Sequence, residues 1–137
     1  MRGVVGDNAG RMTVPSDLAT LTARDLLSLY RRKALSPVEA ARDALSRIER
    51  CEPAINAFVR VEAEAALAQA RASEQRWVKG EPIGRVDGLP ATIKDNIDVA
   101  GWPSRKGSRT TADTPAVADA PAVAHLRREG AVFLGKT

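Results

Sequence analysis

Two short motifs contain the residues of this sequence that could carry out chemistry. One is DGLPATIKDNIDVAG, residues 87–101, which places Lys94 within a run typical of a strand. The other is GAVFLGKT, residues 130–137, which matches the P-loop pattern G-x-x-x-x-G-K-T of nucleotide-binding proteins. The first could supply an amine as a proton acceptor, and the second could bind phosphate. Which chemistry is possible depends on the elements that hold each motif.

The residues around the second motif do not suit a P-loop. A P-loop is an open loop between a strand and a helix, and its backbone N–H groups surround the phosphates. Here the intervening residues AVFL form an apolar run typical of a buried strand, and the preceding PAVAHLRREG predicts a helix that Gly130 ends. We interpret the motif as helix, glycine cap and buried strand, and we expect no nucleotide cofactor.

The first motif leaves two interpretations of Lys94 open. Strand periodicity places Thr92, Lys94 and Asn96 on one face, with Ile93 and Asp95 on the other. A lysine near the end of a strand is most often a solvated charge or a residue that protects a sheet edge. A loop rich in small polar residues follows, however, and functional groups are often presented by loops on a rigid scaffold.

Composition indicates one globular domain without a nucleic-acid partner. The chain has 137 residues, of which 44% are hydrophobic and 4% aromatic, enough for a core of its own. The net charge is +4 and the pI is about 9.7. The basic residues are spread through helical segments, and no aromatic residues interleave with the short clusters at 31–33 and 127–128. Solvated helix faces account for this charge.

The terminus and the rare residues indicate a cytoplasmic protein without metal. A single cysteine, Cys51, excludes an intramolecular disulfide and suits a reducing compartment. A single histidine, His125, argues against a histidine-based zinc site. The sequence lacks a secretory h-region and a run of 18 apolar residues, so we expect no membrane partner. Residues 1–15 are expected to be a disordered extension, with Met12 as an alternative start.

Two helix starts are clear in the first half of the chain. Thr22 and Asp25 form a predicted capping box for a helix that ends near Ala34. The run SPVE, which begins at Ser36, predicts a second helix that Pro53 stops. The second helix has an apolar stripe formed by Val38, Ala41, Leu45 and Ile48.

The rest of the chain alternates between strands and helices, which predicts an α/β fold. Because a helix lies between the last two strands, we expect these strands to be parallel and joined by a crossover. Asp119 is the expected cap of that helix. The expected elements are strand 55–61, helix 62–79, strand 91–99, helix 116–129 and strand 131–135.

The order of motifs resembles the amidase signature family. GLPATIKDNIDVAG, then KGS, a helix and EGAVFLGKT follow that family's pattern, and SPVEAARDALSRIERCEPAINAF is similar to its N-terminal region. The similarity extends from about Leu21 to Thr137. It implies a large mixed sheet covered by helices on both faces, of which residues 16–137 would be the N-terminal portion, incomplete at the C-terminus.

The resemblance also implies an activity, the hydrolysis of carboxylic amides by a Ser-cisSer-Lys mechanism. Lys94 matches the family's catalytic lysine. A free lysine has a pKa near 10.4, so this role requires burial and hydrogen bonds to serine hydroxyls that favour the neutral amine. Asp95 and Asn96 look like supporting residues. Gly107 and Ser108 match a Gly-Ser loop near the site.

One part of the family pattern is missing from this sequence. The family's two catalytic serines lie in a Gly-Ser-Ser-Gly-Gly-Ser stretch after the G-K-T strand, and no such stretch occurs here. Removing the nucleophile from residues that act as a unit removes nearly all catalysis, so we expect the chain alone to be inactive. Its serines, none in that context, are Ser16, Ser28, Ser36, Ser46, Ser73, Ser104 and Ser108.

Several alternatives stay open at this point. The segment PSRKGSR favours a free-standing amidase over the amidase subunit of a tRNA-dependent amidotransferase, which tends to carry a different segment there. A third possibility is a non-enzymatic interaction module, because the terminal strand AVFL would leave an apolar edge. The expected partners are a small-molecule amide in the complete enzyme, and either the missing C-terminal part or a second copy of the chain.

Overall fold

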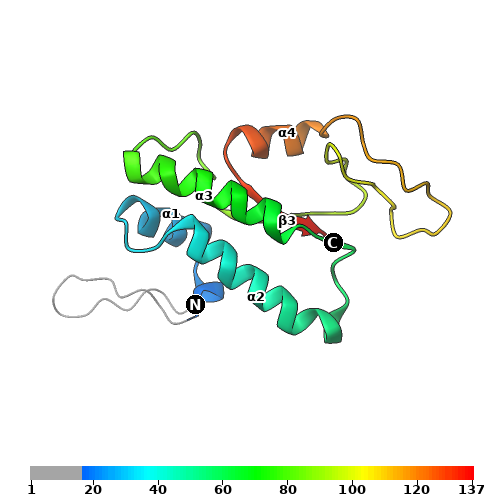
Figure 1. Cartoon of the computed structure of the whole chain (residues 1–137), viewed down its shortest axis with the longest axis horizontal. Coiled ribbons are helices and arrows are strands. Elements are labelled where there is room, and N and C mark those ends of the chain that lie inside the picture. Colours follow the sequence, from blue (N-terminus) through cyan, green and yellow to red (C-terminus); the bar gives the residue numbers. More distant parts are fainter. Residues whose placement is uncertain (1–16) are drawn as a thin grey trace.

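The computed structural model of this chain describes residues 17–137. The predicted extension 1–15 and the alternative start at Met12 lie outside the described residues. Figure 1 shows the helices arranged around a small sheet near the C-terminus. No helix among residues 17–137 is both long and apolar enough to cross a bilayer. The elements are η1 (Leu18–Thr20), α1 (Ala23–Arg31), α2 (Pro37–Ile55), β1 (Arg60–Val61), α3 (Ala63–Lys79), β2 (Pro90–Ile93), α4 (Pro121–Arg128) and β3 (Val132–Lys136).

Both predicted capping boxes are present, so the starts of α1 and α2 are confirmed. The Thr22 hydroxyl accepts from the Asp25 N–H, and the Asp25 carboxylate accepts from the Thr22 N–H. Ser36 and Glu39 make the same pair of bonds, at 3.2 and 2.8 Å. Each cap satisfies backbone donors that a helix start leaves unpaired, which contributes about 1 kcal/mol.

The prediction that Pro53 ends α2 is wrong. The helix continues to Ile55 and ends at Asn56, which has left-handed backbone angles. Pro53 lies in the last turn, where the loss of its N–H removes one helical hydrogen bond and leaves the rest of the helix unaffected. The end is then secured by Glu52, whose carboxylate accepts from the Phe58 N–H at 2.9 Å.

The sheet has the order β1-β3-β2, with β3 parallel to β2 and antiparallel to β1. The predicted parallel pair is therefore confirmed, but both earlier strands are shorter than predicted. The expected strand 55–61 is reduced to Arg60–Val61, and strand 91–99 ends at Ile93. The second strand stops there because the Ile97 N–H turns back to the Lys94 carbonyl, at 2.9 Å.

The terminal strand β3 is central in the sheet, so it does not form the open apolar edge on which the interaction-module hypothesis depended. β3 lies between the other two strands. Beyond the short β1, its remaining edge also has partners, since the Phe133 N–H donates to the Gln69 side chain at 2.9 Å and the Leu134 carbonyl accepts from the Glu62 N–H at 2.8 Å. An interaction module that adds a strand to β3 is not supported by this arrangement.

The helix predicted at 62–79 is confirmed as α3, and Gly80 ends it with a φ of +77°. The helix predicted at 116–129 begins later, at Pro121, and Asp119 is not its cap. The Asp119 carboxylate instead accepts from the Ala100 N–H at 2.7 Å and from the Arg127 guanidinium at 2.7 and 3.0 Å. Proline at the first helical position needs no N–H acceptor, so α4 can start without a side-chain cap.

Helices cover both faces of β3, as the fold prediction required (Figure 1). On one face, Val132 and Leu134 pack against α2 and α3. On the other face, Phe133 packs with Val123 of α4. A third cluster, which includes Tyr30 of α1, Ala40 of α2 and Trp77 of α3, joins α1 to α2 and α3. The mixed α/β architecture is thus confirmed.

The segment GAVFLGKT is a helix end followed by a buried strand, as the sequence indicated. Gly130 follows α4 with a φ of +86°, and a Cβ there would lie 2.7 Å from the Asp87 carboxylate. Gly135 lies within β3, where a Cβ would overlap the backbone carbonyl of Arg60. Lys136 is fully buried. Both glycines and the lysine of the motif therefore have structural roles, and the lysine points away from solvent.

Candidate active site

Lys94 follows β2 directly and is exposed, while its neighbours Ile93 and Asp95 are buried. Thr92 and Asn96 are exposed with it, so the predicted alternation of faces is confirmed even though the strand ends at Ile93. Lys94 is therefore a solvent-accessible amine at the carboxyl end of a strand. Open α/β sheets commonly bind ligands beyond the carboxyl ends of their strands.

The end of β3 fixes the backbone on both sides of Lys94. The Thr137 N–H donates to the Ile93 carbonyl at 3.0 Å, and the Asp95 N–H donates to the Thr137 carbonyl at 2.7 Å. The Lys94 carbonyl accepts from the Ile97 N–H at 2.9 Å. These bonds place the Cα of Lys94 firmly, so its side chain projects from a rigid base.

A cavity of ≈460 Å³ adjoins Lys94, and we call it the polar cavity because most of its lining residues are polar or charged. Four segments that are distant in sequence meet there: the loop after α2, the end of β2, the 103–110 loop and the end of β3. The cavity thus combines two lysines, a carboxylate and an amide with backbone groups. The lining residues are Val59, Lys94, Asp95, Asn96, Lys106, Gly107 and Thr137.

Asp95 links the end of β2 to the loop that contains the Gly-Ser segment. Its carboxylate accepts from the Arg105 N–H at 3.4 Å and from the Gly107 N–H at 3.3 Å. Asp95 therefore supports the loop, whereas Asn96 is exposed and lines the cavity. Ser108, the serine of the Gly-Ser segment, shares a 2.8 Å hydrogen bond with Thr110.

Lys136 is a further charged residue at this end of the sheet, and its role was not predicted from the sequence. Its side chain is 0% exposed. The Nζ donates to the Pro103 carbonyl at 2.9 Å and to the Ser104 hydroxyl at 2.7 Å, and it lies 3.6 Å from the Asp95 Oδ1. A lysine that follows a buried apolar strand needs such partners, because an unpaired buried charge is very costly. The position of Lys136 after the apolar run AVFL and Gly135 could therefore have indicated, from the sequence, a buried lysine with polar partners.

An irregularity in the register explains why Lys136 faces this cluster. Ala91 pairs with Phe133, but the next residue, Thr92, pairs with Gly135, so β3 has one additional residue at this point. After the additional residue, Lys136 pairs with Ile93 and shares its face. A bulge of this kind redirects the side chains that follow it. Simple alternation along β3 would place Lys136 on the opposite face, with Leu134.

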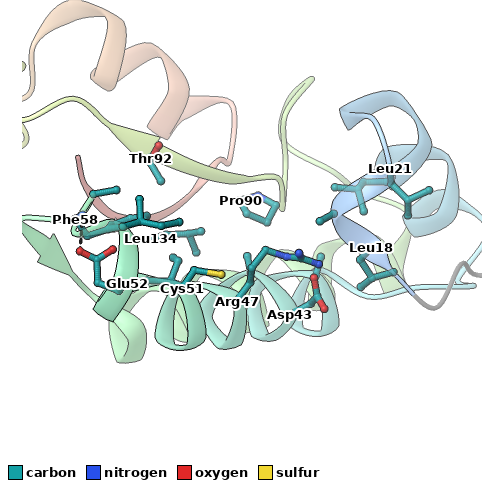
Figure 2. A pocket seen from close by; sticks show the side chains of 17 residues that line it. Leu18, Leu21, Asp43, Arg47, Cys51, Glu52, Phe58, Pro90, Thr92 and Leu134 are labelled. Atoms are coloured by element: carbon teal, nitrogen blue, oxygen red, sulfur yellow. Dashed lines mark hydrogen bonds between the residues drawn. The ribbon is translucent and has the colours of Figure 1, made fainter. Parts of the chain in front are cut away.

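A second cavity of ≈450 Å³ lies between α2 and the sheet and is mainly apolar (Figure 2). Pro90, Thr92 and Leu134 form one wall, and Cys51 of α2 lies on the other. Two charged groups at this groove already have partners: Arg47 bonds to Asp17 at 2.5 Å, and Glu52 accepts from the Phe58 N–H. Lys94 does not line this groove, so the polar cavity is the better candidate for chemistry.

The side chains that line the polar cavity can transfer protons and form hydrogen bonds. The part of the chain that the structure describes has no cluster of metal ligands. Among residues 17–137, no three His, Cys, Asp or Glu side chains are grouped to hold an ion. The nearby serine side chains of the 103–110 loop, Ser104 and Ser108, already bond to Lys136 and Thr110. The arrangement therefore provides a candidate base without an evident nucleophile from the described residues.

Comparison with known proteins identifies the relatives of this chain. The Amidase family profile matches residues 39–137. A glutamyl-tRNA(Gln) amidotransferase subunit from Salinispora tropica is 37% identical over 122 residues, which are 89% of this chain and 25% of the relative. A protein named as an amidase, AmiA2 of Mycobacterium bovis, is 35% identical over all 137 residues, which cover 28% of the relative.

Solved structures agree with these sequence matches. The peptide amidase of Stenotrophomonas maltophilia superposes with a TM-score of 0.81 at 28% identity, over 90% of this chain and 26% of that enzyme. A bacterial aryl acylamidase of the amidase signature family superposes with a TM-score of 0.77 at 30% identity, over 85% of this chain and 25% of that enzyme. This chain spans about a quarter of the length of the relatives it matches.

Proposed function

Because this chain belongs to the amidase family, we propose that it is the N-terminal segment of an enzyme that hydrolyses carboxylic amides, with Lys94 as the catalytic lysine. One observation carries the proposal. Lys94 is an exposed amine on a rigid base at the carboxyl end of β2, beside a polar cavity of ≈460 Å³. A base must be fixed in place and still reach its substrate, and the position of Lys94 suits both requirements. The burial and serine hydrogen bonds that favour its neutral form would come, in this proposal, from the part of the amidase domain that the 137 residues do not include.

In the proposed reaction, Lys94 in its neutral form accepts a proton through a bridging serine from the hydroxyl of a nucleophilic serine. The serine oxygen then forms a bond to the amide carbonyl carbon. The C–N bond breaks as the proton passes to the leaving nitrogen, which departs as ammonia or an amine. Water cleaves the resulting ester, which releases the acid and restores the serine. No external oxidant or cofactor is needed.

The two serines come, in this proposal, from the part of the amidase domain that the 137 residues do not include. This chain covers about a quarter of each compared relative. A base without its nucleophile has almost no activity, because such residues act as a unit. We therefore propose that the 137 residues alone are inactive, and that the complete enzyme acts in the cytoplasm, which suits the free thiol of Cys51, the one cysteine of these 137 residues.

Two kinds of amidase fit the family. The segment PSRKGSR favours a free-standing amidase, and we adopt that assignment. The similarity to the glutamyl-tRNA(Gln) amidotransferase protein favours the second candidate, an amidase subunit that works with partners and charged tRNA. Hydrolysis of simple amides by the complete protein alone supports the first candidate. A strict requirement for partner proteins and charged tRNA would establish the second.

The test of the catalytic assignment uses the complete enzyme and two lysine variants. Lys94→Ala should lower kcat for amide hydrolysis by about 10²–10⁴-fold, which is the usual contribution of a general base. Lys106→Ala is the matched control, because Lys106 is an exposed lysine that lines the same cavity. It should retain most of the activity. Wild-type turnover by the Lys94→Ala enzyme would remove Lys94 from the mechanism.

A separate assay tests whether the chain alone is incomplete. The pure 137-residue chain should release no ammonia or amine from simple amides, while the complete enzyme does. Turnover by the short chain that Lys94→Ala abolishes would contradict the proposed need for the missing serines. Intact-mass spectrometry should accompany this assay, because a co-purifying second polypeptide could supply the serines.

A further inference from the structure

Lys136 is a buried charge that the proposed mechanism does not use. It lies at the end of β3, directly before Thr137, whose backbone holds both sides of Lys94. Lys136 itself pairs with Ile93, the residue that precedes Lys94. Its side chain is 0% exposed, so it does not contact solvent.

The contacts of the Lys136 ammonium join two parts of the site. Three oxygens surround its Nζ: the Pro103 carbonyl at 2.9 Å, the Ser104 hydroxyl at 2.7 Å and the Asp95 Oδ1 at 3.6 Å. The first two distances are those of hydrogen bonds, and the third is that of an ion pair with a carboxylate. Lys136 therefore acts as a fixed charge, in contrast to the exposed amine of Lys94.

Asp95 continues the connection from Lys136 to the cavity. Its carboxylate also accepts from the N–H groups of Arg105 and Gly107, in the loop that borders Lys94. Its own N–H donates to Thr137, so the residue that follows Lys94 is tied to β3 through both backbone and side chain. Removal of Lys136 would leave the Asp95 carboxylate without its counter-charge and the loop without its anchor.

We propose that Lys136 is a positioning residue for Lys94. Its buried ammonium pairs with Asp95 and donates to Pro103 and Ser104 of the 103–110 loop. These contacts fix both the backbone that carries Lys94 and one wall of the polar cavity. The inference rests on the proposed function of Lys94. Displacement of a catalytic group by about 1 Å can cost about 10²-fold in rate, so a residue that never touches substrate can still control kcat.

Lys136→Met in the complete enzyme tests the inference, since methionine keeps an unbranched side chain without the charge. We expect kcat to fall by about 10²-fold, with KM within about threefold of wild type because Lys136 has no exposed surface. Amide hydrogen exchange at Arg105 and Gly107 should accelerate in the same variant. Lys79→Met is the control, because Lys79 is an exposed lysine in the last turn of α3 and does not line this cavity, and it should change neither readout. Wild-type kcat and exchange in Lys136→Met would overturn the inference.

Two further variants separate positioning from general stability. Asp95→Asn combined with Lys136→Met removes both charges, so thermal stability should recover relative to Lys136→Met alone, while kcat stays low. If kcat recovers together with stability, Lys136 has a structural role only and the inference is wrong.

Ser104→Ala tests the same inference if Lys136→Met does not fold. This variant keeps the ion pair between Lys136 and Asp95 and removes one hydrogen bond of the Lys136 Nζ. It should lower kcat by about tenfold, and an unchanged kcat would count against the inference.

The outcome for Lys94→Ala distinguishes this inference from the proposed function. If Lys94→Ala is inactive while Lys136→Met has wild-type kcat, the positioning role fails and the catalytic assignment stands. If Lys94→Ala is fully active, the catalytic assignment fails first, and faster exchange in Lys136→Met would then report only an anchored loop.

Discussion

β2 has a buried carboxylate near each end, and the two carboxylates are held very differently. Before the strand, Asp87 accepts two hydrogen bonds from the Arg76 guanidinium, at 2.6 and 2.9 Å, and one from the Ile83 N–H at 2.9 Å. After the strand, Asp95 accepts backbone bonds of 3.3 and 3.4 Å and lies 3.6 Å from the Lys136 Nζ.

This difference indicates separate roles for the two ends of β2. The Asp87 end maintains the fold, and the Asp95 end carries the groups of the candidate active site. The Asp87 end is closed, because Trp77 donates to the Asp87 carbonyl at 3.1 Å and the Tyr30 hydroxyl donates to the neighbouring Gly88 carbonyl at 3.2 Å. The Asp95 end borders a cavity of ≈460 Å³ and carries the exposed Lys94. Rigid packing at one end supports a reactive group at the other.

The largest effect on stability should come from breaking the closed end. Asp87→Ala removes the buried partner of Arg76, whose side chain is 27% exposed, so the loss should be about 3 kcal/mol, the lower end of the range for a broken buried pair. Urea denaturation of the 137-residue chain measures the loss. Asp119→Ala is the control, because its partner Arg127 is 45% exposed and stays solvated without Asp119. Its loss should be smaller, about 1–2 kcal/mol, since the bond from the Ala100 N–H is lost as well. Equal losses in the two variants would contradict the distinction.

Two glycines with left-handed backbone angles allow a direct comparison of the two ends of β2. Gly130 lies against Asp87, and the Gly107 N–H donates to Asp95. An alanine at either Gly130 (φ +86°) or Gly107 (φ +67°) is strained by about 1–2 kcal/mol. At Gly130 the new Cβ also meets the Asp87 carboxylate at 2.7 Å, whereas at Gly107 nothing lies within 4 Å. Gly130→Ala should therefore lose at least about 1 kcal/mol more than Gly107→Ala. A larger loss for Gly107→Ala would indicate that the cavity end is the tighter one.

Acid should weaken the closed end through Asp87. Burial raises the pKa of this carboxyl, but the hydrogen bonds from Arg76 and the Ile83 N–H outweigh burial and hold the pKa below its ordinary value. The stabilisation is therefore complete above the ordinary pKa of about 3.9, and it is lost as the pH falls through the lower folded-state value. Asp119 contributes in the same direction, because the Arg127 hydrogen bonds lower its pKa.

Melting temperatures between about pH 6 and pH 2 measure this acid effect. Asp87→Asn should flatten the curve, since the variant has no proton to gain at this position. The remaining slope in that variant reports Asp119 and other carboxylates. An unchanged slope in Asp87→Asn would show that Asp87 does not carry the acid sensitivity.

Local signals in the sequence were sufficient for several elements. The capping boxes at Thr22 and Ser36 are formed by residues three apart, so a short pattern fixes them. The shared face of Thr92, Lys94 and Asn96 followed from alternation along one strand. Such features depend on neighbours in the sequence, and they were predicted correctly.

Features that depend on distant contacts could not be predicted in this way. Asp119 was expected to cap α4 but bonds to Ala100 and Arg127, which only the folded chain brings within reach. The additional residue in β3 reverses the face of Lys136, and nothing in the run AVFLGKT indicates it. The connection from Lys136 to Asp95 therefore became visible only in the structure.

The role of Lys94 as the base is tested most directly by the rate of the chemical step in the complete enzyme under single-turnover conditions. Enzyme in excess over a chromogenic amide reports release of the amine without interference from product dissociation. We expect Lys94→Ala to slow this step by about 10²–10⁴-fold and Lys106→Ala to leave it near the wild-type rate. A wild-type rate in Lys94→Ala would show that the amine at the end of β2 is not the base.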